Sequence, residues 1–170
     1  MTTKEDLTWN GARVNVDEIL VRILPCIAGR PEVVFAYVFG STARAEARLD
    51  SDVDIAVFLT PEMAQTDLGP FRSMLLTELL ACLSRNDVDL VILNQAPAVL
   101  RHRVLRDGVL IFSRDETARV GFTVDTLRRY VDTAPLRRLA MEYTRRSVEN
   151  GTYGRAVPFR TVLDSRQAPG

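Results

Sequence analysis

Two aspartates separated by one apolar residue stand where a polar segment turns into an apolar run. Asp52 and Asp54 flank Val53, and apolar residues then alternate with other side chains as far as Leu59. Side chains two apart on a strand leave on the same face, so both carboxylates project together while Val53 points into the core. Parallel carboxylates repel unless a cation lies between them, and their hard oxygens suit magnesium or manganese rather than zinc. The sequence therefore predicts a divalent-cation site at the beginning of a strand.

A glycine–serine pair ends the preceding apolar run. Residues 33–39 are β-branched and aromatic, which predicts a strand, and Gly40 and Ser41 follow it directly. Without a Cβ the backbone can approach a phosphate, and amide groups at a following helix start point outward. Ten residues separate Ser41 from Asp52. The Walker and dinucleotide glycine patterns are absent, so Gly40 and Ser41 are candidates for a different kind of phosphate-binding turn.

A third carboxylate comes from another predicted strand, residues 88–93. Asp89 lies at its head, and Asp87 is a competing candidate. Asp89 is preferred because it directly abuts the apolar run. Three converging carboxylates are what a two-metal phosphoryl-transfer site requires.

Other patterns predict helices around these strands. A first helix begins near Asp17 and ends where Pro25 makes its continuation costly. A second follows the Gly69-Pro70 pair. That helix covers residues 71–83. The remaining predicted elements are a short helix at 42–47, a helix at 98–106, a strand at 109–112, and two helices within 116–148 that Pro135 separates.

Length and composition fit one compact domain with an appendage. The chain has 170 residues, of which 46% are hydrophobic. We expect a core at 1–115, a helical C-terminal extension at 116–150 and a flexible tail at 151–170. Cys26 and Cys82 fall in helical apolar patterns, where we interpret them as buried thiols that act as small hydrophobes, without a metal or redox role.

The charge pattern limits the partners. The formal net charge is zero, which argues against a chain that grips a long nucleic-acid backbone, so direct nucleic-acid binding is not expected. Residues 121–170 nevertheless carry nine basic and five acidic side chains, which favours contact with an acidic partner. The polar residues 1–10 and the lack of a run of about 20 apolar residues predict a cytoplasmic protein without a membrane span.

The stretch GSTARAEARLDSDVDIAV, with VDLVIL further on, resembles the DNA polymerase beta-like nucleotidyltransferase superfamily. Within it, the chain is most similar to the minimal nucleotidyltransferases that serve as antitoxins beside HEPN-domain toxins. The resemblance covers about residues 33–112, and the helical segment 127–154 also looks like the C-terminal part of these antitoxins. It implies an α/β fold with a small mixed β-sheet flanked by helices.

The resemblance also implies roles for individual residues. Asp52 and Asp54 match the metal-binding pair, Asp89 matches the third carboxylate, and Gly40 and Ser41 match the triphosphate-binding turn. Arg44 matches a frequent nucleotide-binding arginine, although this arginine and Arg48 can also be read as exposed loop charges. This chain departs from the family pattern at Ala45, where many relatives have glycine.

The implied activity is transfer of AMP from ATP, with two magnesium ions, to a hydroxyl group. The resemblance favours a tyrosine of a HEPN toxin as the acceptor, and therefore an antitoxin that acts by AMPylation. Two alternatives stay open: an adenylyltransferase for small molecules such as aminoglycoside antibiotics, and an antitoxin that neutralises its partner by binding alone.

Overall fold

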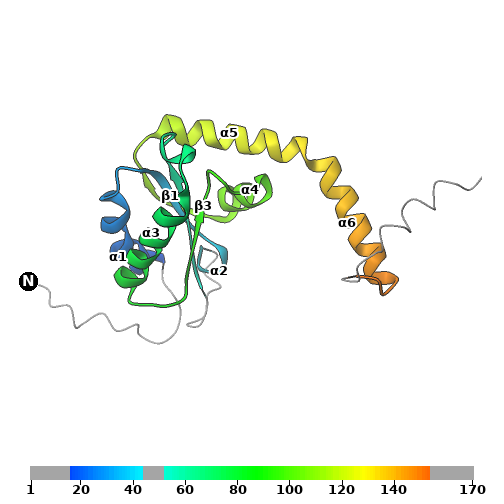
Figure 1. Cartoon of the computed structure of the whole chain (residues 1–170), viewed down its shortest axis with the longest axis horizontal. Helices are drawn as coiled ribbons and strands as arrows, with labels where there is room; N and C mark the ends of the chain where they lie inside the picture. Colours follow the sequence, from blue (N-terminus) through cyan, green and yellow to red (C-terminus); the bar gives the residue numbers. More distant parts are fainter. Residues whose placement is uncertain (1–15, 44–51, 154–170) are drawn as a thin grey trace, which may run out of the picture. The chain divides into compact units, whose positions relative to one another are not determined.

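A computed structural model describes residues 16–43 and 52–153. Four strands form one mixed sheet in the order β3-β2-β1-β4 (Figure 1). β1 (Val33–Phe39) pairs antiparallel with both β2 (Val53–Leu59) and β4 (Val109–Ser113), whereas β2 pairs parallel with β3 (Val88–Ile92). The predicted α/β fold with a small mixed sheet is confirmed, and β1 and β2 have the predicted bounds. β3 is one edge of the sheet.

The sheet has an apolar layer on each face. On one face the odd-numbered residues of β2, from Val53 to Leu59, pack with α1 (Val16–Ala28) and α3 (Leu68–Leu83). On the other face Phe35 and Phe58 pack with α4 (Ala98–Asp107) and with Phe122 of α5 (Glu116–Asp132). Figure 1 shows α1 and α3 together on one side of the sheet and α4 on the other. This alternation follows from the two-residue period of a strand buried on both faces.

The first helix continues past the proline that was expected to end it. α1 runs to Ala28 with Pro25 inside. Ile19, Ile23 and Ile27, spaced by four residues, are all fully buried, so the packing of Ile27 offsets the amide hydrogen bond that proline lacks. The helix then ends where the Gly29 amide donates to the Pro25 carbonyl at 3.1 Å.

The helix predicted at 71–83 begins three residues earlier. The Asp67 side chain caps it by accepting a hydrogen bond from the Gly69 amide at 3.0 Å. Gly69 and Pro70 therefore lie in the first turn, where proline is tolerated because the amide groups there lack helical partners. A short 3₁₀ helix, η1 (Met63–Gln65), lies between β2 and α3 and was not predicted.

The interpretation of the two cysteines as separate thiols is wrong. A disulfide joins Cys26 of α1 to Cys82 of α3. The two residues are 56 positions apart, and they meet because both helices pack on the same face of the sheet. Sequence spacing alone carried no sign of this pairing.

Two helices form the C-terminal part, as predicted from Pro135. α5 (Glu116–Asp132) ends before this proline, and α6 (Ala134–Glu149) has it in its first turn. By its internal contacts the chain divides into two units after Tyr130, so α6 belongs to the second. None of the α6 residues is buried, and Leu136, Leu139 and Tyr143 are about two-thirds exposed. The predicted short helix at 42–47 is represented by α2 (Gly40–Ala43), and its remainder lies outside the described residues.

Candidate functional site

The structure places two of the three predicted carboxylates on neighbouring strands. Asp54 of β2 and Asp89 of β3 are direct partners in the parallel pairing. Residues in register on neighbouring strands project from the same face of the sheet, and this is the face that packs against α4. Asp52 immediately precedes β2 and is exposed, while Val53 between the two aspartates is fully buried, as predicted.

Gly40 lies directly against Asp54. It follows β1 and has a φ of +74°, a left-handed conformation that side-chain-bearing residues avoid. A Cβ at this position would collide with the Asp54 carboxylate. The missing side chain therefore lets the turn and the carboxylate approach each other closely, which is the arrangement expected where a phosphate-binding turn meets a carboxylate site.

Two hydrogen bonds hold the beginning of β2 in place. The buried Thr42 of α2 donates its hydroxyl to the Asp52 carbonyl at 3.3 Å. The Val53 amide donates to the Asp87 carbonyl at 2.9 Å. The segment that carries Asp52 and Asp54 is thus hydrogen-bonded both to the helical turn that begins at Gly40 and to Asp87, the residue before β3.

Arg85 distinguishes Asp87 from Asp89. Its guanidinium binds the Asp87 carboxylate through two nitrogens, one of them Nε at 2.7 Å from Oδ1. These hydrogen bonds lower the pKa of Asp87 below its ordinary value, although burial opposes the shift. The same hydrogen bond to Asp87 raises the pKa of Arg85, with smaller contributions from the charges of Asp87 and Asp52. Asp87 is therefore engaged in an ion pair, and Asp89 is the residue in register with Asp54.

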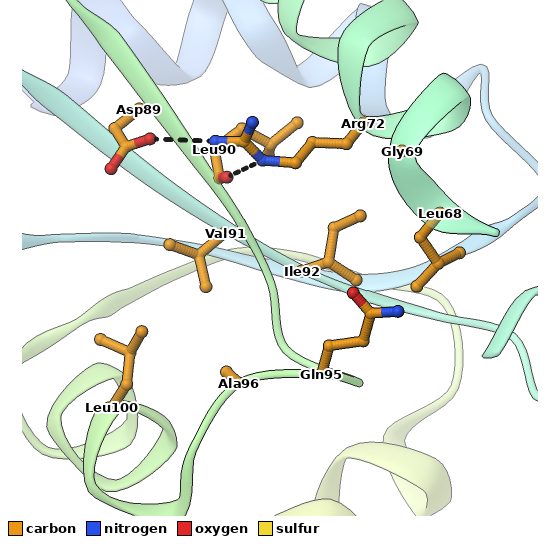
Figure 2. Close-up of a pocket in the computed structure, with 10 residues that line it drawn as sticks. All are labelled: Leu68, Gly69, Arg72, Asp89, Leu90, Val91, Ile92, Gln95, Ala96 and Leu100. Atoms are coloured by element: carbon orange, nitrogen blue, oxygen red, sulfur yellow. Dashed lines mark hydrogen bonds and ion pairs between the residues drawn. The ribbon is translucent and has the colours of Figure 1, made fainter.

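Arg72 of α3 is a site residue that the sequence analysis missed. Its Nη2 lies 3.4 Å from Oδ1 of Asp89, and its Nε donates to the Leu90 carbonyl at 2.9 Å (Figure 2). Seventeen positions separate Arg72 from Asp89. Arg72 is the one basic residue of α3 and follows the Gly69-Pro70 pair by two positions, and this was the only signal in the sequence.

A cavity of about 330 Å³ opens beside Asp89 at the free edge of β3. Arg72 and Leu68 of α3 lie on its one side, and Leu100 of α4 lies on the other (Figure 2). The cavity therefore extends from Asp89 along the edge of the sheet.

The donor set fits a hard divalent cation. Asp54 and Asp89 supply carboxylate oxygens from adjacent strands, and such ligands are typical of magnesium sites. Among residues 16–43 and 52–153 no three acidic, histidine or cysteine side chains are gathered closely enough to form a complete metal site. The three-carboxylate metal site therefore stays a prediction, for which the Asp54–Asp89 pairing is favourable.

The other predicted positions differ in what the structure describes. Ser41, in α2, is half-buried beside Gly40. Arg44, Ala45 and Arg48 lie outside the described residues. Within the part of the chain that is described, no helix is both long and apolar enough to cross a membrane.

Comparison with solved structures shows similarity to toxin–antitoxin complexes. One chain, from a toxin–antitoxin crystal structure with AMP-PNP, is 27% identical with a TM-score of 0.63 and covers 72% of this chain and 95% of its own length. Another chain comes from a complex of the tri-AMPylated Shewanella oneidensis HEPN toxin with an MNT antitoxin. It is 26% identical with a TM-score of 0.59, and it covers 74% of this chain and 95% of its own length. No curated protein sequence matches significantly.

The family model described as "Polymerase beta, Nucleotidyltransferase" matches residues 22–117. This range contains the sheet, the glycine turn and all three predicted carboxylates. The chain belongs to the polymerase beta nucleotidyltransferase family.

Proposed function

We propose that this protein transfers AMP from ATP to a tyrosine hydroxyl of a HEPN-domain toxin and so acts as its antitoxin. The observation that carries the proposal is the pairing of Asp54 with Asp89 across β2 and β3, beside a glycine turn where any Cβ would collide with the Asp54 carboxylate. That arrangement combines a cation-binding edge with a phosphate-binding turn, as nucleotidyl transfer needs.

Each residue has a role in this proposal. Asp52, Asp54 and Asp89 would hold two magnesium ions, which supply charge neutralisation for the triphosphate and for the developing transition state. The backbone at Gly40 and the Ser41 hydroxyl bind oxygens of the leaving phosphates. Arg44, carried over from the family resemblance, would add a positive charge to the nucleotide site.

The reaction is an in-line displacement at the α-phosphorus of ATP. The acceptor oxygen forms a bond to that phosphorus, the bond to the oxygen bridging to the β-phosphate breaks, and pyrophosphate leaves with the electron pair. Asp89 takes the proton from the acceptor hydroxyl. Arg72 and the Leu90 carbonyl keep the Asp89 carboxylate in place beside the edge cavity.

The helices of the C-terminal part support a protein partner. α6 buries none of its residues and exposes Leu136, Leu139 and Tyr143, which share one helix face by their spacing. Tyrosine and arginine are enriched at protein interfaces. Both described relatives come from toxin–antitoxin complexes, and we therefore assign partner docking to α6.

Labelled ATP tests the proposal. We expect the chain, incubated with magnesium, ATP labelled at the α-phosphate and a HEPN-domain toxin, to place label on a toxin tyrosine located by mass spectrometry. The Asp52→Asn variant should lower the rate at least about 100-fold, because one metal ligand is lost, whereas Asp132→Asn, an exposed aspartate at the end of α5, should leave it unchanged. Wild-type transfer by Asp52→Asn would contradict the assignment.

The same variant separates catalysis from neutralisation by binding alone. The exposed apolar face of α6 is the observation that favours the binding alternative. If Asp52→Asn still silences the toxin in growing cells without labelling it, neutralisation is by binding. If label reaches an aminoglycoside and never the toxin, the acceptor is a small molecule.

A further inference from the structure

A second cavity lies between the far end of β2 and the helices α4 and α5. Its volume of about 430 Å³ falls within the roughly 300–1,000 Å³ that small-ligand sites occupy. The described residues that line it all differ from those that line the cavity beside Asp89. Phe58, which lines it, is four residues beyond Asp54 on β2, a distance of about 13 Å along a strand. The second cavity is therefore separate from the carboxylate pair.

Apolar groups form most of its wall. One side of α5 contributes residues at spacings of three and four, as a single helix face does. Phe58 and Phe122 touch each other, with ring centroids 5.0 Å apart. The lining residues are Phe58, Pro61, Asn94, Arg101, Ala118, Gly121, Phe122 and Asp125. The cavity therefore presents aromatic and aliphatic surface to an occupant, with only three polar side chains.

Arg101 of α4 is short of hydrogen-bond acceptors. Its side chain is only 13% exposed, and its guanidinium lies over the Phe122 ring, with Cζ 5.4 Å from the ring centroid. Its Nη2 donates to the Asn94 carbonyl at 2.7 Å. Among the described residues, its buried Nε has no acceptor at all. A guanidinium carries five N–H donors and no acceptor, so this arginine is the group of the cavity that a further acceptor would satisfy.

The carboxylate beside Arg101 is engaged by another arginine. Asp125 accepts a hydrogen bond from Arg129 Nε at 2.9 Å, whereas Nη1 of Arg101 lies 3.7 Å from Asp125, beyond hydrogen-bond distance. Burial lowers the pKa of Arg101 below its ordinary value, the charge of Arg129 lowers it further, and the charge of Asp125 opposes the shift. Two cations thus share one carboxylate, which leaves one positive charge uncompensated at the cavity.

Asn94 has its side chain engaged elsewhere. Its amide oxygen accepts from the Leu59 backbone amide at 2.8 Å, and its amide nitrogen donates to the Leu59 carbonyl at 3.0 Å. These bonds join the end of β2 to the loop before α4. The choice of ligand therefore depends on the Arg101 guanidinium and on the apolar wall.

We propose that this cavity is a binding site for a small aromatic monocarboxylate. The carboxylate accepts hydrogen bonds from the Arg101 guanidinium, a pairing whose charge and planar geometry match. The ring packs against Phe122 and Pro61. A single negative charge balances the one left over by Arg101, Arg129 and Asp125, whereas the further charges of a polyanion would be repelled by Asp125. The site is independent of the nucleotidyl transfer proposed above.

Methyl NMR on the full chain measures the binding. The chain, with labelled alanine methyl groups, is titrated with 3-phenylpropionate. We expect a shift of the Ala118 methyl that saturates, while the methyl of Ala81, which is exposed on α3 and does not line the cavity, stays in place. 3-Phenylpropionamide has the ring without the charge, and acetate has the charge without the ring. Each should bind at least about tenfold more weakly, because one of the two kinds of contact is lost.

Two variants test the assigned contacts. Arg101→Gln removes the cation and should weaken binding of 3-phenylpropionate at least about tenfold. Gly121→Leu should weaken it as much by filling the cavity, since a Cβ at Gly121 meets open space. Val124→Leu, on the same helix and 62% exposed, is the matched control and should bind as the wild type does, because Val124 does not line the cavity. Thermal melting establishes that each variant is folded, and Gly121→Leu decides the test if Arg101→Gln does not fold.

Several results would overturn the site. They are an Ala118 methyl that does not move, equal shifts at Ala81, equal affinity for the amide or for acetate, and wild-type affinity in Gly121→Leu. None of them bears on nucleotidyl transfer. Conversely, a chain that transfers no AMP to any acceptor but binds 3-phenylpropionate as expected refutes the proposed function and leaves this site standing.

Discussion

At the residue scale, Gly40 makes the most specific prediction. Gly40→Ala should destabilise the fold by about 1–3 kcal/mol, because alanine is strained at positive φ, and should also reduce transfer because its Cβ displaces the Asp54 carboxylate. Urea unfolding and the labelled-ATP assay measure the two effects. Substitutions at two other glycines distinguish the effect of backbone strain from the effect of displacing the carboxylate. Gly151 has a φ of +64° with open space around it, and Gly121 lies in α5 with open space and no positive φ.

Gly151→Ala should therefore show strain without loss of transfer, and Gly121→Ala should be neutral or slightly stabilising, since alanine is the better helix former by about 1 kcal/mol. If Gly40→Ala retains full activity, the close approach of the turn to Asp54 has no functional role.

At the element scale, the Arg85–Asp87 ion pair stabilises the segment that immediately precedes β3. The Arg85 side chain is only 8% exposed, and its hydrogen bonds lower the pKa of Asp87. A carboxylate with a lowered pKa stabilises the folded state above its ordinary pKa, and this contribution disappears as the pH falls through the lowered value. Asp87→Asn should therefore cost about 1–2 kcal/mol at pH 7. The difference from wild type in urea unfolding should shrink steadily below about pH 4; a difference independent of pH would contradict the ion-pair explanation.

At the scale of the whole molecule, the Cys26–Cys82 disulfide cross-links the two helices on one face of the sheet. A cross-link that closes a loop of this length typically stabilises a protein by about 2–4 kcal/mol. We expect dithiothreitol to lower the free energy of unfolding by that amount. The Cys26→Ser/Cys82→Ser variant should show the same loss and no response to the reductant. Equal stability of the oxidised wild type and the double variant would show that the cross-link does not stabilise the fold.

The sequence by itself determined the strands and indicated the candidate carboxylates. β1 and β2 have the predicted bounds because β-branched and aromatic runs of strand length end at glycine or polar residues. The Asp-Val-Asp pattern placed Val53 in the core, and the spacing from Gly40 indicated which turn belongs to the site. Such signals are local, and a strand or a turn is specified mainly by its own residues.

Tertiary structure alone decided which distant residues meet. The register that pairs Asp54 with Asp89, the reach of Arg72 to Asp89 and the pairing of Cys26 with Cys82 all depend on how separate elements pack. The continuation of α1 beyond Pro25 depends on the burial of Ile27. In each case the stabilising contact lies outside the element concerned, so neither periodicity nor propensity within that element could reveal it.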